Sequence, residues 1–203
     1  MKQLTRDNLS LLLFNSMNMV EPYPESVAPV NCMATTNTAF FPGGKGLWLA
    51  GHPNQFPDIL VLGQDFSTEA WYIEMLKGKE IDLDSPTWRN MIRLFTQTDI
   101  DLHRCFFSNV FMGLRRTKSM TGEFPGFKDK PFVRRNVDFL SYQIDIVRPK
   151  VIISLGKYAA EMLTSLSLKD LSRWKGWQAL KVADVGFVRD VKFLDHICNC
   201  VAL

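Results

Sequence analysis

The sequence predicts an α/β domain whose mostly parallel sheet is covered by helices on both faces. Four short segments are apolar at almost every position and have the length of strands; they span 59–62, 105–111, 151–155 and 197–203. Segments with apolar residues at helical spacing alternate with them. Strands of this kind need apolar cover on each face, and alternation with helices is typical of a parallel sheet.

Three helices are expected around these strands because apolar residues recur there every three or four positions. These residues are Trp88, Met91, Ile92 and Phe95 in the first helix, Val133, Val137, Leu140, Ile144 and Val147 in the second, and Tyr158, Ala159, Met162 and Leu163 in the third. Pro149 should end the second helix, since proline disfavours the helical conformation in the residue before it.

The length of 203 residues allows one domain with a sizeable core and is too short for two ordinary domains. We therefore expect a single α/β domain over 1–203, in which 1–57 form an N-terminal helix and then an irregular segment. Prolines after the helix favour extended or turn structure there. The leucines that make this helix amphipathic are Leu4, Leu9, Leu12 and Leu13.

The composition, with 46% hydrophobic and 22% charged residues, is that of a globular protein. No apolar run near the start is long enough for an export signal or a membrane span. The four cysteines lack CxxC spacing, so a cytoplasmic chain with reduced thiols is the simplest interpretation. Cys198 and Cys200 fit two strand residues facing one core layer better than metal ligands. We expect a monomer with no metal, cofactor or membrane partner.

Cationic side chains are concentrated between residues 113 and 135. They are Arg115, Arg116, Lys118, Lys128, Lys130, Arg134 and Arg135. The net charge of +3 and the pI of about 8.7 permit a nucleic-acid partner without requiring one. Arg115, Arg116 and Lys118 are therefore candidates for contacting a nucleic-acid backbone. A solvated loop followed by the first turn of a helix explains the charges equally well.

Polar residues follow the apolar segments where the strands are expected to end. Gly63, Gln64 and Asp65 follow the first strand, and Asn109 lies in the second. In parallel sheets, ligands bind outside the carboxyl ends of the strands. A glycine there lets the backbone turn sharply and would hold the Asp65 carboxylate at the rim of the sheet. The alternative is that Asp65 caps a helix beginning near Ser67.

Four stretches between residues 58 and 163 carry a more specific signal, in a fixed order. They read "VLGQDFS", "DSPTWRNMIRLF", "FFSNVF" and "IVRPKVIISLGKYAAEML". They resemble, in turn, the strand-end Gly-Gln-Asp motif of the uracil-DNA glycosylase superfamily, the helix start that follows it, the strand whose Asn contacts the flipped base, and a later strand–helix unit. Any one of these matches alone would be weak, but four in order are fairly specific.

The resemblance implies a three-layer α/β/α fold with a short, mostly parallel sheet, and an enzyme of DNA repair. Such an enzyme hydrolyses the N-glycosidic bond of uracil or another deaminated base in single- or double-stranded DNA. By resemblance, Asp65 positions the attacking water, Gln64 contacts the base through its backbone, and Asn109 reads the Watson–Crick edge. Phe66 is a candidate for stacking on the base, with a core position as the alternative.

Three departures from the superfamily pattern affect this hypothesis. Phe66 and Ser67 replace the Pro-Tyr of the uracil-specific branch, which leaves the base selectivity open. The cysteines of the iron–sulfur branch are missing, so we expect no cluster. The His-Pro-Ser motif that follows the last strand is absent before the end at Leu203, and His196 precedes that strand. Since losing an oxyanion donor typically costs about 10²–10³ in rate, we expect either a truncated chain or weak or absent activity.

Two other functions are compatible with the sequence. The first is a catalytically silent relative that binds nucleic acid or a protein through the same cleft. The second, a nucleotide-binding α/β domain of another kind, is less supported, because the sequence contains neither GxxxxGK[ST] nor GxGxxG.

Overall fold

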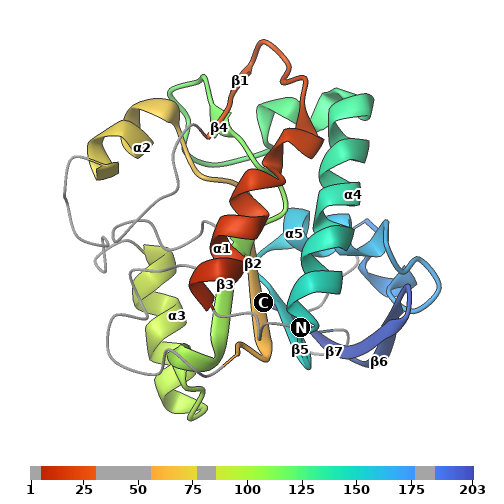
Figure 1. Cartoon of the computed structure of the whole chain (residues 1–203). Helices are drawn as coiled ribbons and strands as arrows, with labels where there is room; N and C mark the ends of the chain where they lie inside the picture. The colour runs from red at the N-terminus through yellow and green to blue at the C-terminus, as the bar shows by residue number, and fades with distance from the viewer. Residues whose placement is uncertain (1–5, 31–55, 77–85, 177–185) are drawn as a thin grey trace.

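A computed structural model describes residues 6–30, 56–76, 86–176 and 186–203 (Figure 1). Its central sheet has five strands in the order β3-β2-β5-β7-β6. The strands are β2 (Ile59–Gly63), β3 (Cys105–Asn109), β5 (Val151–Ser154), β6 (Phe187–Phe193) and β7 (His196–Ala202). Neighbouring strands are parallel except for β6, which pairs antiparallel with β7. The predicted α/β class with a mostly parallel sheet is confirmed.

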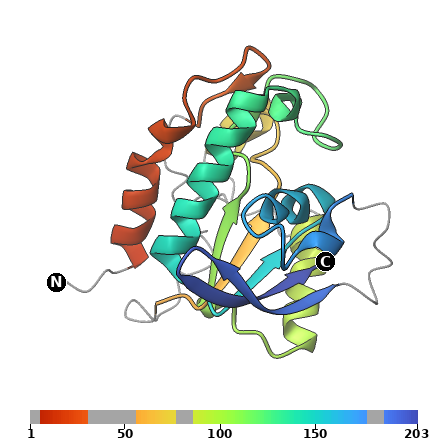
Figure 2. The ribbon, with the colours of Figure 1, turned by 90° about the vertical axis from the view of Figure 1, so that its right-hand side faces the viewer.

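Helices cover both faces of this sheet. The α-helices are α1 (Arg6–Asn15), α2 (Glu69–Leu76), α3 (Pro86–Gln97), α4 (Lys130–Val147) and α5 (Lys157–Thr164), and the short 3₁₀ helices are η1 (Met17–Val20), η3 (Leu102–Arg104), η4 (Pro125–Lys128) and η5 (Ser172–Trp174). In Figure 2, α1 and α4 lie on one side of the sheet and α3 on the other. None of the helices in the described parts of the chain is long and apolar enough to cross a bilayer.

The nearly continuous apolar character of the strands follows from these two layers. Leu60 and Leu62 of β2 pack into the core that contains α1, α4 and α5. Ile59 and Val61 point the other way, into the smaller core formed with α3. Because successive strand residues face opposite sides of a sheet, both sets must be apolar. The alternation therefore accounts for the sequence pattern that predicted the strands.

The N-terminal helix is confirmed as α1, with Leu9 and Leu13 buried against the rest of the core. Leu4 lies outside the described residues, as does the 31–55 part of the expected irregular segment. The end of α4 also agrees with expectation. The helix stops at Val147, and Arg148 adopts a left-handed C-cap conformation (φ 46°) before Pro149.

Three strands, β1 (Val27–Ala28), β4 (Leu114–Arg115) and β6, were not expected from the sequence. The edge strand β6 is largely exposed, and a bulge between Val188 and Val191 breaks the alternation by which it would have been recognised. A small second sheet pairs β1 with β4, and two residues per strand are too few for a periodic pattern. This small sheet matters for the site described below, because it fixes the backbone of Arg115.

The amino ends of the central strands are tied together at Asp58. Its carboxylate accepts hydrogen bonds from Arg104 Nε (3.0 Å) and Nη2 (2.8 Å). Its backbone N–H donates to Arg104 O, and its carbonyl accepts from Lys150 N. The side chains of Asp58 and Arg104 are 22% and 43% exposed. Hydrogen bonds from Arg104 hold the pKa of Asp58 below its ordinary value.

We predict that Asp58→Asn lowers the free energy of unfolding by about 1 kcal/mol or less at neutral pH, because the pair is screened by solvent. The lowered folded-state pKa means that the stabilisation is present above the ordinary value of 3.8 and is lost as the pH falls through the folded value. Urea unfolding of both proteins at neutral and acidic pH would check this. A deficit that stays constant into acid would contradict it.

Candidate active site at the carboxyl ends of β2 and β3

The carboxyl ends of β2 and β3 meet in register. Gly63 pairs with Asn109 in the parallel ladder. The pairing continues past the strands, where Val110 N donates to Gly63 O and Phe111 N donates to Gln64 O, both at 3.0 Å. The structure thus brings Gln64 and Asp65 beside the segment that contains Asn109.

Asp65 is held by a buried, two-point ion pair with Arg115. Arg115 Nε donates to Oδ1 at 3.0 Å and Nη2 donates to Oδ2 at 2.7 Å. The side chain of Asp65 is only 5% exposed, and that of Arg115 is 2% exposed. Oδ1 also accepts the backbone N–H of Ser67 at 2.8 Å. Two planar groups paired in this way are among the strongest and most directional contacts in proteins.

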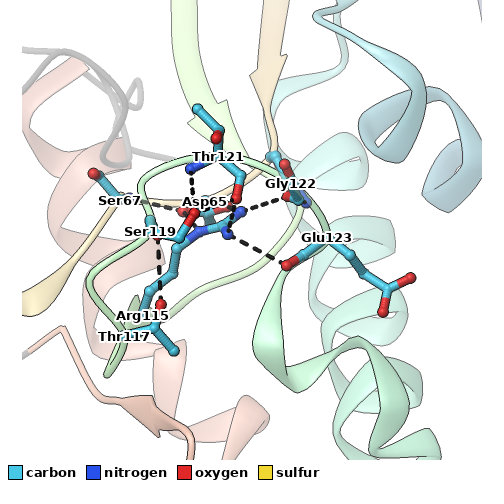
Figure 3. Close-up of polar contacts among 9 residues, drawn as sticks. Asp65, Ser67, Arg115, Thr117, Ser119, Thr121, Gly122 and Glu123 are labelled. Atoms are coloured by element: carbon cyan, nitrogen blue, oxygen red, sulfur yellow. Dashed lines mark hydrogen bonds and ion pairs between the residues drawn. The ribbon is translucent and has the colours of Figure 1, made fainter.

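The same guanidinium also holds the backbone of a surface loop, residues 116–123. Nη1 donates to the carbonyls of Thr121 (3.0 Å) and Glu123 (3.3 Å), and Nη2 donates to that of Gly122 (2.9 Å). Figure 3 shows Arg115 between Asp65 and this backbone. With the bonds to Asp65, each of the five N–H groups of the guanidinium has an acceptor. Gln64 Nε2 adds a hydrogen bond to Gly122 O at 3.2 Å.

The backbone of the neighbouring segments sets this geometry. Arg115 pairs with Val27 in the small sheet, and its N–H donates to Ser67 O at 2.9 Å. Ser67 has a left-handed backbone (φ 72°), which turns the chain between Asp65 and α2. Thr68 Oγ1 accepts the N–H of Trp71 and so caps α2. The helix therefore has a cap other than Asp65.

Asn109 is fully buried, and α4 supports the segment that follows it. Met112 N donates to Asn136 Oδ1 at 2.8 Å, and Asn136 Nδ2 donates to Phe132 O at 2.8 Å. Ser108 Oγ donates to Gln143 Oε1, also on α4. Both amide side chains are buried in the middle of α4. Asn136 is hydrogen-bonded through both amide atoms, whereas the buried Nε2 of Gln143 has no hydrogen-bond partner among the described residues.

The predicted aromatic contact lies away from solvent. Phe66 is buried in the core with its ring edge-on to Tyr72, at 6.1 Å between centroids. Half-buried rings are found instead at Phe127 and Tyr158, whose centroids are 6.1 Å apart. Phe127 also meets the buried ring of Phe111, two residues after Asn109. Phe127 lies in the cationic 113–135 segment, and only the tertiary structure places its ring beside Tyr158 of α5.

The three side chains predicted to contact a nucleic-acid backbone differ in their exposure to solvent. Arg115 is buried against Asp65, whereas Arg116 and Lys118 are exposed. Arg116 Nη1 donates to Glu25 O at 3.3 Å, and its Nε lies 3.8 Å from Glu69. The exposed charge of the loop therefore comes from Arg116 and Lys118 and leaves out Arg115.

His196, Cys198 and Cys200 lie on β7, outside this site. His196 begins β7, and its Nε2 is 2.6 Å from Pro149 O, at the opposite end of the sheet from Asp65. Cys198 and Cys200 are buried in the core, as expected, and a hydrogen bond with Cys198 together with burial raises the pKa of Cys200. Within the described ranges, no group of three or more His, Cys, Asp or Glu side chains could hold a metal. His52 and Cys32 lie outside these ranges.

Comparison with known proteins found no family model and no curated protein that matches this chain.

We predict that Arg115→Ala lowers the free energy of unfolding by about 3–5 kcal/mol, because it leaves a buried carboxylate without its counter-charge. Arg134→Ala is a matched control. Its pair with Asp138 on α4 is exposed (78% and 52%), and its loss should cost about 0.5 kcal/mol or less. Urea unfolding of the two variants measures both effects. Equal losses would contradict a structural role for the buried pair.

Proposed function

We propose that this chain is a DNA N-glycosylase of the uracil-DNA glycosylase kind, acting on uracil or another deaminated base. The observation that best supports the proposal is the meeting of Gly63-Gln64-Asp65 with Asn109 in register at one edge of the sheet. These are the residues that the motif resemblance singled out, and this edge is where parallel sheets bind ligands. Action as a cytoplasmic monomer is part of the same proposal.

Asp65 would carry the central step. As the glycosidic bond breaks, positive charge develops on the sugar, and a fixed carboxylate stabilises it and orients water for attack. A carboxylate has about four acceptor positions. Protein donors fill two on Oδ1 and one on Oδ2, so a water would bind at the second acceptor position of Oδ2. Water would attack the sugar carbon while the base leaves with the bonding electrons, and the proton that the attacking water loses would end on the departing base.

Asn109 would recognise the base. Its amide offers one acceptor and two donors, which match the N3–H and O4 groups of uracil. Asn109 is fully buried, so a base would have to leave the stack, and the residues that cover Asn109 would have to move, before the two could meet. Flipping costs roughly a few kcal/mol and least for mismatched or single-stranded DNA, so such substrates should be preferred. Arg116 and Lys118 would contact phosphates from the exposed loop.

One observation favours a second candidate function. In it, the chain is a catalytically inactive relative of the glycosylases that binds DNA without releasing a base. The negative charge of Asp65 is balanced by Arg115 in a buried pair. A neutralised carboxylate stabilises a developing cation less than an isolated one does. Tight binding of uracil-containing or abasic DNA, without base release, would identify this function.

We predict release of uracil from a labelled oligonucleotide, tested as a single strand and as a U·G duplex with subsequent alkaline cleavage. Asp65→Asn should lower the rate by about 10²–10³, the typical cost of losing one such electrostatic contact. Asp58→Asn is the matched control, since Asp58 lies at the other end of β2 and is also paired with an arginine. Its rate should equal that of the wild type. Equal activity in both variants would remove Asp65 from the mechanism.

We also predict that affinity for DNA falls with salt, and that Arg116→Gln combined with Lys118→Gln reduces this dependence. The log–log slope should drop by about 0.9 per lost phosphate contact in duplex DNA, close to two for both residues. Lys169→Gln, an exposed lysine after α5, serves as the control. A slope that is the same in all three proteins would exclude loop 116–123 from the DNA interface.

A further inference from the structure

Loop 116–123 and the Asp65 carboxylate share one anchor. Three consecutive carbonyls, those of Thr121, Gly122 and Glu123, turn inward onto the guanidinium that also binds Asp65. Other hydrogen bonds also hold the loop: Gln64 Nε2 donates to Gly122 O, and Arg116 N donates to Ser26 O. Of these contacts, those of Arg115 link the loop directly to the Asp65 carboxylate, so one side chain contributes to the position of both (Figure 3).

The loop also carries two exposed cationic side chains. Arg116 and Lys118 are exposed, as is Met120, while Arg115 is buried. Lysine could not replace Arg115 in this arrangement. A single ammonium group has three donors at one point, whereas the planar guanidinium spans two carboxylate oxygens and three carbonyls at once.

We propose that Arg115 is a positioning residue that joins Asp65 and loop 116–123 into one unit. It turns the carboxylate so that Oδ2 keeps its second acceptor position for water, and it holds the phosphate-binding loop at a fixed place relative to that water. This inference rests on the proposed glycosylase function. Arg115 itself touches neither the base nor the water. Its contribution is to geometry, where a shift of about 1 Å in a reacting group can cost 10²-fold in rate.

The first test compares kcat and KM for base release in two variants. Arg115→Lys keeps the charge and removes the two-point contact, so kcat should fall about 10- to 100-fold. Lys169→Gln, a substitution of an exposed lysine after α5, should leave both kcat and KM at their wild-type values. A wild-type kcat in Arg115→Lys, with the wild type active, would overturn the inference and leave the proposed function standing. No base release by the wild type would overturn both.

The second test separates positioning from stability. Trypsin cleavage after Lys118 should be faster in Arg115→Lys than in the wild type, while cleavage after the exposed Lys169 stays the same.

Guanidinium ion, added to Arg115→Ala well below denaturing concentrations, should restore part of kcat, whereas sodium chloride at the same ionic strength should not. A merely structural arginine predicts the opposite, because guanidinium destabilises folded proteins. No gain in kcat with guanidinium and an unchanged cleavage rate would refute the proposal.

Discussion

The buried ion pair between Asp65 and Arg115 is the contact on which the carboxyl edge of the sheet depends. Burying two charges is costly unless every donor and acceptor finds a partner. Here the five N–H groups of Arg115 are satisfied by Asp65 and by three loop carbonyls. The end of β2, the small sheet and loop 116–123 consequently form one structure. None of these parts could shift alone without exposing an unsatisfied group.

The rest of the fold makes this edge rigid. The β2–β3 ladder extends beyond both strands through Val110 and Phe111, so the residues after the sheet are held as firmly as those inside it. Beyond Phe111, the backbone N–H of Met112 donates to the side-chain oxygen of Asn136 on α4. A helix on the main core and two strand ends therefore define the place of Asn109. Sites built on such elements keep their geometry better than sites on free loops.

An Asp–Arg ion pair lies at each end of β2, and the two pairs differ in how deeply they are buried. Asp58 and Arg104 are 22% and 43% exposed, and water competes for both. Asp65 and Arg115 are 5% and 2% exposed, so their pairing is nearly shielded from solvent. The first pair contributes modestly to joining the strands. The Asp65–Arg115 pair fixes the position of the Asp65 carboxylate and the groups around it. Catalysis at the carboxyl ends of the strands would depend on that fixed position.

The sequence by itself determined the elements that repeat a local pattern. Apolar runs and helical spacing located β2, β3, β5, β7 and the helices α3, α4 and α5, because burial imposes the same periodicity along the whole element. It also marked Asp65 and Asn109, because ligands bind outside the carboxyl ends of parallel strands and because both residues lie in motifs that resemble those of the glycosylase superfamily. Only the tertiary structure decided that Arg115 faces inward. Its partner lies fifty residues away, and no local pattern distinguishes an arginine that meets a buried carboxylate from one that meets water.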